Sequence, residues 1–509
     1  MSDTVVPIEV LSPGEIAFER VRRKIGVVLA PAIFLGILLL PMEGLKPEAH
    51  RLAAILAAVV VLWVTEALPM PVTALLGTSV AVVLRVAPAR EVFAPFADPL
   101  MFLFIGAFIV ARAIFHHRLD KRFAYSVLSL PWVGARPGRI LFAYGAVTCF
   151  ISGWISNTAT TAMMFGIGMS ILAFFFGEAK GAAAGSVQAV NPRFATGLML
   201  MTAFAASIGG LMTPIGTPPN VIGLGFMRDQ LDIEISFFEW MMIGVPVVIV
   251  LYIILFTYLN FVSPAGVREI AGSRELIHRL RAALGPWTTA QRSTALAFAT
   301  TVFLWILPGI IALAAGDRSP LYQAVNRSIP EGVAALLGAL LLFVLPGDDG
   351  ERAITWREAV KIDWGIVLLY GGGFALGVLS FQTGLAESMG RGLTGLLPWD
   401  GSFALLVASV LIAVILSEAT SNTAAANMIV PVVISIAVAA GVDPLEPALG
   451  ATMAASLGFM LPVSTPCNAI VYGSGYIPLT RMIRYGFILD VAGIIVIITA
   501  VRLMSSLLR

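Results

Sequence analysis

Apolar residues fill most of the chain in long stretches that short polar segments separate. A bilayer core about 30 Å thick needs ~20 consecutive apolar residues for one helical crossing. Eleven stretches have this character, so we expect eleven membrane-spanning helices. They cover residues 25–40, 52–68, 71–86, 99–115, 195–227, 240–262, 295–315, 330–345, 364–381, 449–476 and 485–508.

Two more apolar blocks, 140–176 and 403–440, are each interrupted by three consecutive polar residues. Successive side chains on a helix diverge by about 100°, so three in a row cannot all reach one neighbouring helix. A turn that faces water or protein satisfies such a cluster better, which predicts two re-entrant hairpins with polar tips. The tips are Ser156, Asn157 and Thr158 in the first block, and Ser421, Asn422 and Thr423 in the second.

Prolines interrupt two of the predicted spans, 195–227 and 449–476. A proline removes a backbone donor and clashes with the preceding turn, so we expect two broken helices. Carbonyl groups freed by a break are natural ligands for a cation, and Gly216 allows the backbone to approach closely. The first break contains Thr213, Pro214, Gly216, Thr217, Pro218, Pro219 and Asn220, and the second contains Pro462, Ser464, Thr465, Pro466, Cys467 and Asn468.

The two halves of the chain match at four short segments, here called stations, which occur in the same order in each half. Five predicted spans separate the matched stations, and because this number is odd, the two copies must have opposite orientations. Inverted repeats with broken helices are typical of secondary transporters, with the binding site between the repeats. A channel would more naturally show a charged ring or a filter loop, and neither is visible. The stations are 72–77 with 333–338, 106–108 with 372–374, 156–159 with 421–424, and 216–220 with 464–468.

Composition agrees with a polytopic membrane protein. Of the 509 residues, 58% are hydrophobic and only 12% are charged, about half the charged share of soluble domains. Mean hydropathy is +0.92. The net charge of +2 comes without a basic–aromatic patch, so nucleic acid is not an expected partner. Four histidines outside the clusters and two cysteines in apolar stretches suggest no catalytic constellation, so we do not expect an enzyme.

Charge in the loops predicts the orientation. With both hairpins entering and leaving on one side, 21 Lys and Arg residues lie on the cytoplasmic side and 10 outside. Because cytoplasmic loops carry the excess of Lys and Arg, this bias places the N-terminus in the cytoplasm. We therefore expect a multi-pass protein of the plasma membrane, the inner membrane in a bacterium, with the lipid bilayer as its surroundings.

The clusters and breaks together offer sites for both signs of charge. Freed carbonyls and the Ser and Asn oxygens suit a hard monovalent cation, whereas amides, hydroxyls and the N-termini of half-helices suit an anion. Neither cluster nor break contains Lys, Arg or His. A dianion there would need bound cations to offset its charge, which makes cation coupling physically sensible. The duplication predicts two cation sites that flank one anion site.

The paired Ser-Asn-Thr motifs, each followed by a Thr-Pro motif, resemble the divalent anion:sodium symporter family, which includes the sodium-dependent dicarboxylate transporters. The resemblance runs from about residue 52 to the C-terminus. It implies a homodimer whose protomers each have a scaffold domain and a transport domain that moves like an elevator. It also implies a small dicarboxylate such as succinate, malate or fumarate as substrate, with Na⁺ as the coupling ion. The implied substrate residues are Ser156, Asn157, Thr158, Thr217, Pro218, Ser421, Asn422, Thr423, Thr465 and Pro466.

The same resemblance implies two sodium sites and a division of the chain. The first site would use Ser152, Ser156, Asn157 and Gly216, and the second Ser417, Ser421, Asn422 and Ser464. Pro214 beside Gly216, and Cys467 where the family often has proline, depart from the pattern without removing a side-chain ligand. The expected division is a cytoplasmic segment 1–24, scaffold helices 25–97, transport elements 98–235, linking and scaffold helices 236–363, transport elements 364–480 and a C-terminal helix 481–509.

Alternatives stay open at this stage. A sodium-independent dicarboxylate exchanger, a sulfate or other inorganic dianion transporter and, more remotely, an anion channel fit the same pattern. Two intramembrane acids also need a role. Glu418 either tunes the second hairpin and its cation site or is a structural acid bonded to backbone, and Glu66 is expected to be solvated or to cap a helix. His116 and His117 point different ways on a helix and are expected at the interface, not on a metal.

Overall fold

The computed structural model describes residues 13–42, 44–181, 190–270, 272–316, 318–394 and 401–505. Within these ranges the regular elements are helices, apart from one isolated bridge between Pro346 and Arg352. This confirms the all-α architecture. Residues 1–12 of the expected N-terminal segment and residues 506–509 of the expected C-terminal helix lie outside the described ranges.

The first half of the chain runs from α1 to α11. Its two hairpin arms, α7 and α8, are followed by a helix that is interrupted between α9 and α10. The elements are α1 (Pro13–Leu39), α2 (Pro47–Thr65), α3 (Met70–Val83), α4 (Ala89–Phe93), η1 (Ala94–Ala97), α5 (Pro99–His116), α6 (Leu119–Leu128), α7 (Pro137–Ser152), α8 (Asn157–Gly181), α9 (Pro192–Gly209), η2 (Gly210–Met212), α10 (Pro218–Leu231) and α11 (Phe237–Val262).

The second half repeats this plan. Its hairpin arms are α19 and α20, and its interrupted helix consists of α21 and α22. The elements are α12 (Ser273–Ala282), α13 (Thr289–Ala315), α14 (Pro320–Ser328), α15 (Glu331–Val344), α16 (Trp356–Ala359), α17 (Trp364–Gln382), α18 (Leu385–Thr394), α19 (Ser402–Ala419), α20 (Asn422–Ala439), α21 (Leu445–Ala454), α22 (Pro466–Tyr472) and α23 (Leu479–Met504).

Ten described helices are long and apolar enough to cross a membrane, or eleven if the bent pair α14 and α15, which meet at 59°, is one span. The number agrees with the expected eleven, but the helices that make up the set differ from the predicted spans. Three of the ten, α8, α19 and α20, are arms of the hairpins. The helix α3 has only 14 residues, and α1 begins at Pro13, well before the predicted span 25–40.

Caps in the sequence fix where many helices begin. Asp98 accepts a hydrogen bond from the backbone of Leu100 at the start of α5. Ser236 and Glu239 form a reciprocal capping box at the start of α11, and Thr288 does the same with Gln291 at α13. Proline occupies the first turn of α10 and α22, where its missing N–H costs nothing.

The duplication is visible in the packing of equivalent glycines. A methyl group on Gly244 of α11 would lie 2.5 Å from the carbonyl oxygen of Leu211 in the first break. A methyl group on Gly486 of α23 would lie 2.3 Å from the carbonyl oxygen of Phe459 in the second. In both halves, therefore, the helix after the break approaches the broken backbone so closely that only glycine fits at that point.

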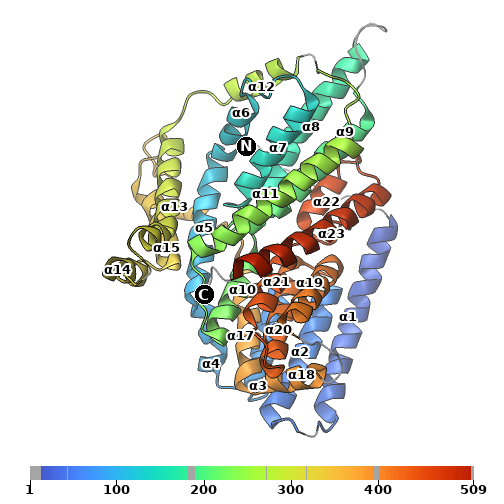
Figure 1. The fold of residues 1–509 in the computed structure, drawn as a ribbon, viewed down its shortest axis with the longest axis vertical. Helices are drawn as coiled ribbons and strands as arrows, with labels where there is room; N and C mark the ends of the chain where they lie inside the picture. The colour runs from blue at the N-terminus through green and yellow to red at the C-terminus, as the bar shows by residue number, and fades with distance from the viewer. Residues whose placement is uncertain are drawn as a thin grey trace.

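The two halves interlock. The half-helix α22 packs on α8 and α9 of the first repeat, and α10 packs on α20 and α21 of the second. Figure 1 shows α11 and α23 running side by side across the middle of the molecule, with α13, α14 and α15 on one flank and α1 on the other. The breaks therefore lie inside a shared core, not at the edge of either repeat.

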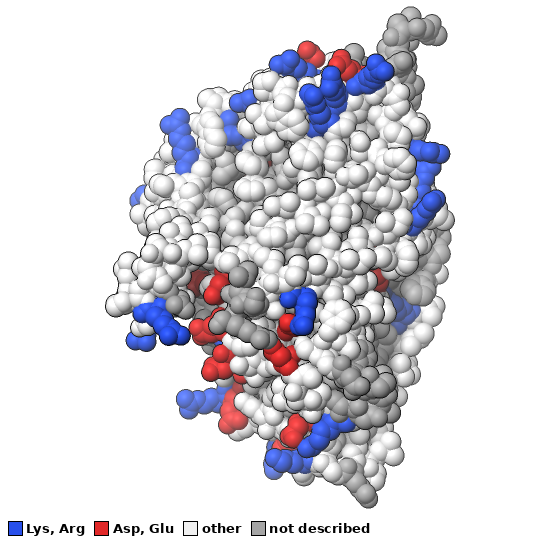
Figure 2. All heavy atoms as spheres, viewed as in Figure 1, with Lys and Arg blue, Asp and Glu red and all other residues white. Residues whose placement is uncertain are grey.

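Charged side chains are sparse on the visible face and gather toward the two ends (Figure 2). Lys and Arg dominate the end that carries α6 and α12, whereas Asp and Glu gather in the opposite half of the view. Between them lies a broad uncharged surface. This distribution is what a protein surrounded by a bilayer requires, because its apolar belt faces lipid.

Candidate functional site

The first hairpin tip and the first break are joined by hydrogen bonds. Ser152 ends α7, and its Oγ lies 2.8 Å from the side-chain amide of Asn157, which begins α8. When the Asn157 amide is oriented with its nitrogen toward the neighbouring carbonyl oxygens, Nδ2 donates to the carbonyls of Ala206 (3.1 Å) and Gly216 (3.2 Å). Three of the four residues expected at the first sodium site are thus brought together. Ser156 directly precedes Asn157 on the tip, where its Oγ accepts from the backbone N–H of Ala159 at 3.4 Å.

The first break is held open by a buried asparagine. Nδ2 of Asn220 donates to the carbonyls of Gly210 (2.9 Å) and Thr213 (2.8 Å). Thr213 in turn donates to the carbonyl of Gly153 at the hairpin tip. A methyl group on Gly216 would lie 2.4 Å from the carbonyl oxygen of Gly210, so the loop closes tightly at this point. The break is therefore a defined structure and not a frayed helix.

The second hairpin repeats this arrangement. Ser417 lies in the last turn of α19, and its Oγ lies 2.9 Å from Oδ1 of Asn422 and donates to the carbonyl of Ala455 (2.8 Å). Nδ2 of Asn422 faces the carbonyl of Ser456 at 3.4 Å. Ser421 caps α20 by accepting from the backbone of Ala424 (3.2 Å). Two copies of one Ser–Asn–carbonyl arrangement thus lie at the two breaks.

Asparagine also fixes the second break. Nδ2 of Asn468 donates to the carbonyls of Gly458 and Leu461, both at 2.9 Å. These are the positions that correspond to the partners of Asn220 in the first repeat. Sequence reasoning placed both asparagines in the breaks but gave them no part in the site. The signal was their repetition at equivalent places, each three residues after a Thr.

The residues expected to bind substrate differ in exposure. Thr217 and Thr465 are 3% and 5% exposed and immediately precede α10 and α22, whose first residues are Pro218 and Pro466. Thr158 is exposed, and the other tip residues are partly buried: Ser156, Asn157, Ser421, Asn422 and Thr423. Four helices, α8, α10, α20 and α22, begin at these residues, and each presents the positive end of its dipole there.

Ser464 has a partner that its expected role did not include. Its Oγ donates to Oε2 of Glu418 (2.5 Å) and also lies 3.1 Å from the backbone carbonyl of that residue. Glu418 is 6% exposed, and Oε1 accepts from the backbone N–H of Met460 (2.8 Å). The carboxylate therefore ties the second hairpin to the second break.

A pocket of about 1120 Å³ adjoins the second hairpin tip. Ser421, Ser464, Thr465 and Pro466 line it together with basic residues of α1 and with Glu66. Arg22 forms an ion pair of 2.9 Å with Glu66, which caps the end of α2. The basic residues are Arg20, Arg22, Arg23 and Lys24. Sequence reasoning counted them only for orientation, because nothing in a basic run before a first span indicates that it folds back beside a distant motif.

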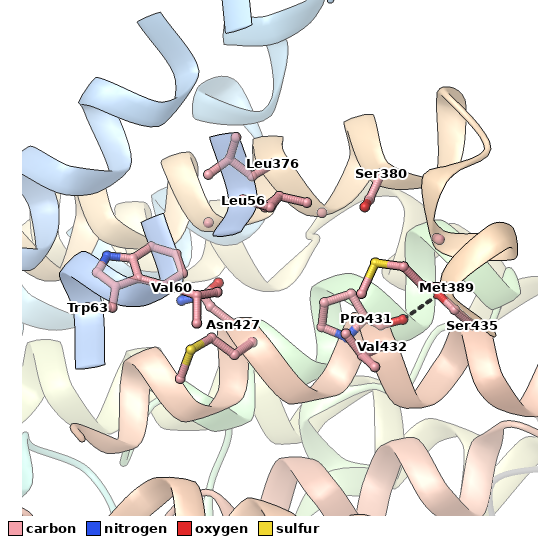
Figure 3. Close-up of a pocket in the computed structure, with 14 residues that line it drawn as sticks. Leu56, Val60, Trp63, Leu376, Ser380, Met389, Asn427, Pro431, Val432 and Ser435 are labelled. Atoms are coloured by element: carbon pink, nitrogen blue, oxygen red, sulfur yellow. Dashed lines mark hydrogen bonds between the residues drawn. The ribbon is translucent and has the colours of Figure 1, made fainter. Parts of the chain in front are cut away.

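A second cavity, of about 90 Å³, lies between α2, α17, α18 and α20. Figure 3 shows Trp63, Val60 and Leu56 facing Asn427 and Pro431 across it, with the bond from Ser435 to the carbonyl of Pro431 at one end. Its lining is mainly apolar. It is too small and too short of polar groups to hold a dicarboxylate.

The side chains that usually bind transition metals do not cluster in the described ranges. No group of three or more His, Cys, Asp or Glu side chains in that part of the chain is placed to hold a metal ion. The ring of His117 bonds to the carbonyl of Ala353 (2.6 Å), and His116 lies 3.7 Å from Glu358. Any cation bound at the breaks would be held by hydroxyl, amide and carbonyl oxygens, the ligands of a hard cation.

Comparison with known proteins places this arrangement in a family. The family described as "Sodium:sulfate symporter transmembrane region" matches residues 22–508. The chain belongs to this family. Among its relatives is a protein of Staphylococcus saprophyticus named "Sodium-dependent dicarboxylate transporter SdcS", 33% identical over 483 residues that cover 94% of this chain and 90% of that protein. A protein of the same name in Staphylococcus aureus strain bovine RF122 is 34% identical over 489 residues, again covering 94% of this chain and 90% of the relative.

A solved structure shares the fold. It is reported as "Crystal structure of the Alcanivorax borkumensis YdaH transporter reveals an unusual topology". It matches with a TM-score of 0.52 over 95% of this chain and 97% of that one, at 12% sequence identity. This likeness concerns the fold alone. The expected all-α architecture with about eleven apolar spans is thereby confirmed for this member of the sodium:sulfate symporter family.

Proposed function

We propose that the protein is a secondary active transporter that couples the uptake of a small dicarboxylate to sodium across the plasma membrane. The observation that carries this proposal is the duplicated arrangement at the breaks, where a Ser–Asn pair from a hairpin meets backbone carbonyls of a broken helix. The relatives named as sodium-dependent dicarboxylate transporters align over nearly the whole chain, including both breaks.

Each copy has the donor set for one sodium ion. Ser152 and the Gly216 carbonyl supply oxygens in the first repeat, and Asn157 would add its amide oxygen by turning its side-chain amide toward the ion. Ser417, Asn422 and Ser464 supply oxygens in the second repeat. These oxygens are uncharged, so two bound sodium ions bring two positive charges. A dicarboxylate brings two negative charges. Binding all three together leaves no net charge in the low-dielectric interior, which is the physical basis of coupling.

The substrate carboxylates have donors at the hairpin tips. Ser156, Thr158, Ser421 and Thr423 carry the hydroxyls, and the N-termini of α8 and α20 begin beside them. A carboxylate at a helix N-terminus is stabilised by the unpaired backbone N–H groups and by the dipole. Thr217 and Thr465 begin the half-helices that face the same region, so they add hydroxyls from the breaks.

The basic residues of α1 give the pocket beside the second tip a positive field. Four Lys or Arg side chains line it, against one acid. Such a field concentrates dianions and speeds their encounter with a binding site. With the N-terminus in the cytoplasm, the cytoplasmic side is the one on which transported substrate is released. In an exchanger it is also the side on which substrate is collected.

Packing suggests which elements move together. The helix α5 packs most extensively along α15, and α17 along α3. The interlocked hairpins and half-helices, α7 to α10 and α19 to α22, form a second body that contains both candidate sodium sites. We propose that this second body is the moving unit of an elevator and that two protomers pair through their scaffolds. In this proposal α3, α5, α15 and α17 belong to the scaffold, so α5 and α17, which the sequence division counted among the transport elements, change sides.

Uptake by proteoliposomes tests the function. An inward sodium gradient is expected to drive accumulation of labelled succinate, and replacing sodium with choline is expected to abolish it. Uptake that persists in choline but requires internal dicarboxylate would identify an exchanger. Competition separates the substrate classes, because excess sulfate should leave succinate uptake intact. Current without saturable uptake would identify a channel.

Two substitutions test the site. Asn157→Ala and Asn422→Ala each remove an amide that joins a hairpin to a break. Each variant is expected to insert normally but to lose sodium-driven uptake, because one cation loses a ligand and the dianion loses the charge that offsets its own. Sodium-driven uptake at normal levels in both variants would show that the cations bind elsewhere.

A further inference from the structure

The half-helix α10 joins the proposed moving body to the scaffold, whereas its counterpart in the second repeat does not. α10 packs on α17, and Figure 1 shows the two helices side by side. By the duplication, α22 corresponds to α10 and α5 to α17, yet α22 and α5 make no comparable contact in the described part of the chain. With the N-terminus in the cytoplasm, the end of α10 lies on the outer side of the membrane. The outer side is therefore packed shut, while the pocket of about 1120 Å³ opens at α22.

The contact between α10 and α17 is close. A methyl group on Gly225 of α10 would lie 2.7 Å from the hydroxyl oxygen of Tyr370 and 3.3 Å from the ring of Phe374. The next residue, Phe226, packs its ring against Phe374 with the centroids 5.4 Å apart. Gly473 occupies the place of Gly225 in the second repeat, but it is exposed, and a methyl group there would meet only carbonyls of its own helix. The two repeats are thus caught in different arrangements.

An ion pair reinforces the closed contact. Asp98 immediately precedes α5 of the scaffold, and Arg228 lies in the last turn of α10. Oδ2 of Asp98 accepts from the guanidinium of Arg228. Oδ1 accepts from the backbone N–H of Leu100 (2.8 Å) and from the hydroxyl of Tyr370 (3.4 Å). The Asp98 side chain is only 8% exposed. Separating the pair would leave this carboxylate buried without its positive partner, which is strongly destabilising.

The second repeat has no counterpart of this ion pair. The residue that caps α17, as Asp98 caps α5, is Asp363, and it is exposed. The residue that follows the Thr-Pro motif at the same distance as Arg228 is Tyr476, and residues 466–480 contain no Lys or Arg. An ion pair can therefore hold the outer contact, whereas the corresponding inner contact has no cation with which to form one.

We propose that Asp98 and Arg228 form a latch that holds the transporter closed to the outside. The proposal rests on the proposed elevator, in which the end of α10 must leave α5 and α17 whenever the sites open to the outside. Tyr370 positions the Asp98 carboxylate for this pair. Because only the outer contact carries the latch, the empty transporter rests with its sites open to the cytoplasm, and the pair separates before external substrate binds.

The accessibility of the covered surface tests the latch. Leu100 is 8% exposed, and a methyl group on Gly225 would lie 3.5 Å from its side chain, so α10 shields this position. Leu100→Cys is introduced into the full-length protein, whose own two cysteines are buried. Right-side-out membrane vesicles, free of sodium and substrate, then receive a membrane-impermeant maleimide from outside. The labelling rate follows the population in which α10 has moved away.

Loss of either charge is expected to speed this labelling. Asp98→Asn keeps a capping side chain for α5, and Arg228→Gln keeps most of the length of the arginine. Each should label about tenfold faster or more, as expected when a hydrogen bond between charged groups is lost. The double variant should label no faster than the faster single variant, because both changes remove the same interaction. Arg502→Gln is the matched control, since it breaks an ion pair with Glu446 (3.0 Å) away from this boundary, and its rate should stay unchanged.

Unchanged labelling in both single variants would overturn the latch, as would increases that multiply in the double variant. If one single variant does not fold, the other decides. The labelling needs neither sodium nor substrate, so it judges the latch separately from the proposed function. That function would instead fail if the wild type showed no sodium-driven uptake.

Discussion

Asn220→Ala is expected to loosen the first break and with it the first sodium site. Asn220 is fully buried, and its amide donates to two carbonyls that no helical N–H can reach, those of Gly210 and Thr213. Alanine removes both of these donors, so the Gly210 carbonyl loses its bond from the amide, whereas the Thr213 carbonyl keeps the bond from the Gly216 N–H (3.3 Å). The loop that carries Gly216 then has one tie fewer to the half-helix α10.

The size of the effect follows from the two lost hydrogen bonds. In membrane proteins such bonds average about 0.6 kcal/mol each, and an acceptor left buried without a partner costs about 1–3 kcal/mol. Since a carbonyl has a second lone pair and the cavity left by the amide can admit water, we expect a loss of about 2 kcal/mol. Sodium affinity should fall about tenfold or more, as it does when a residue that orients a metal ligand is removed.

Thermal unfolding in detergent, followed across a sodium titration, measures both the loss of stability and the loss of sodium affinity. Asn468→Ala, the equivalent change in the second repeat, should behave alike, because its amide makes the same two bonds. Asn260→Ala is the control, since this asparagine is exposed on α11. If Asn220→Ala melts at the wild-type temperature and responds to the same sodium concentrations, the amide does not hold the break, and the reasoning fails.

Two other predictions concern packing and pH. Gly216→Ala places a methyl group 2.4 Å from the Gly210 carbonyl oxygen and should cost about 1–3 kcal/mol of stability in an unfolding assay. The control is Gly36→Ala, whose methyl group meets no atom within 4 Å and should cost nothing. Equal losses of stability in the two variants would contradict the packing argument. Burial raises the pKa of Asp120 on the short helix α6 from 3.8 to about 6. The folded state therefore binds this proton more tightly, so the contribution of Asp120 to stability is fully present below pH 4 and is lost as the pH rises through about 6. Asp120→Asn should then stabilise the protein by about 2–3 kcal/mol at pH 8 and by little at pH 4, and a gain that is the same at both pH values would refute the buried-charge explanation.

The sequence by itself determined the membrane architecture and the positions of the polar clusters and helix breaks. Apolar stretches of span length, paired Ser-Asn-Thr clusters and proline breaks have purely local causes: the bilayer excludes unpaired polar groups, and proline cannot continue a helix. The hairpin tips therefore fall between α7 and α8 and between α19 and α20, as predicted. The match of the two halves also follows from the sequence, because duplicated residues keep their spacing.

Only the tertiary structure decided which distant groups meet. The sequence gives no reason for the α1 arginines to line the pocket of Ser421, or for the Met460 N–H to donate to Glu418, because both contacts depend on how segments far apart in the chain pack. The roles of Asn220 and Asn468 were hidden for the same reason, since a buried amide matters through the carbonyls it reaches. Local sequence patterns decide the secondary structure of each segment. Long-range packing decides which side chains come into contact.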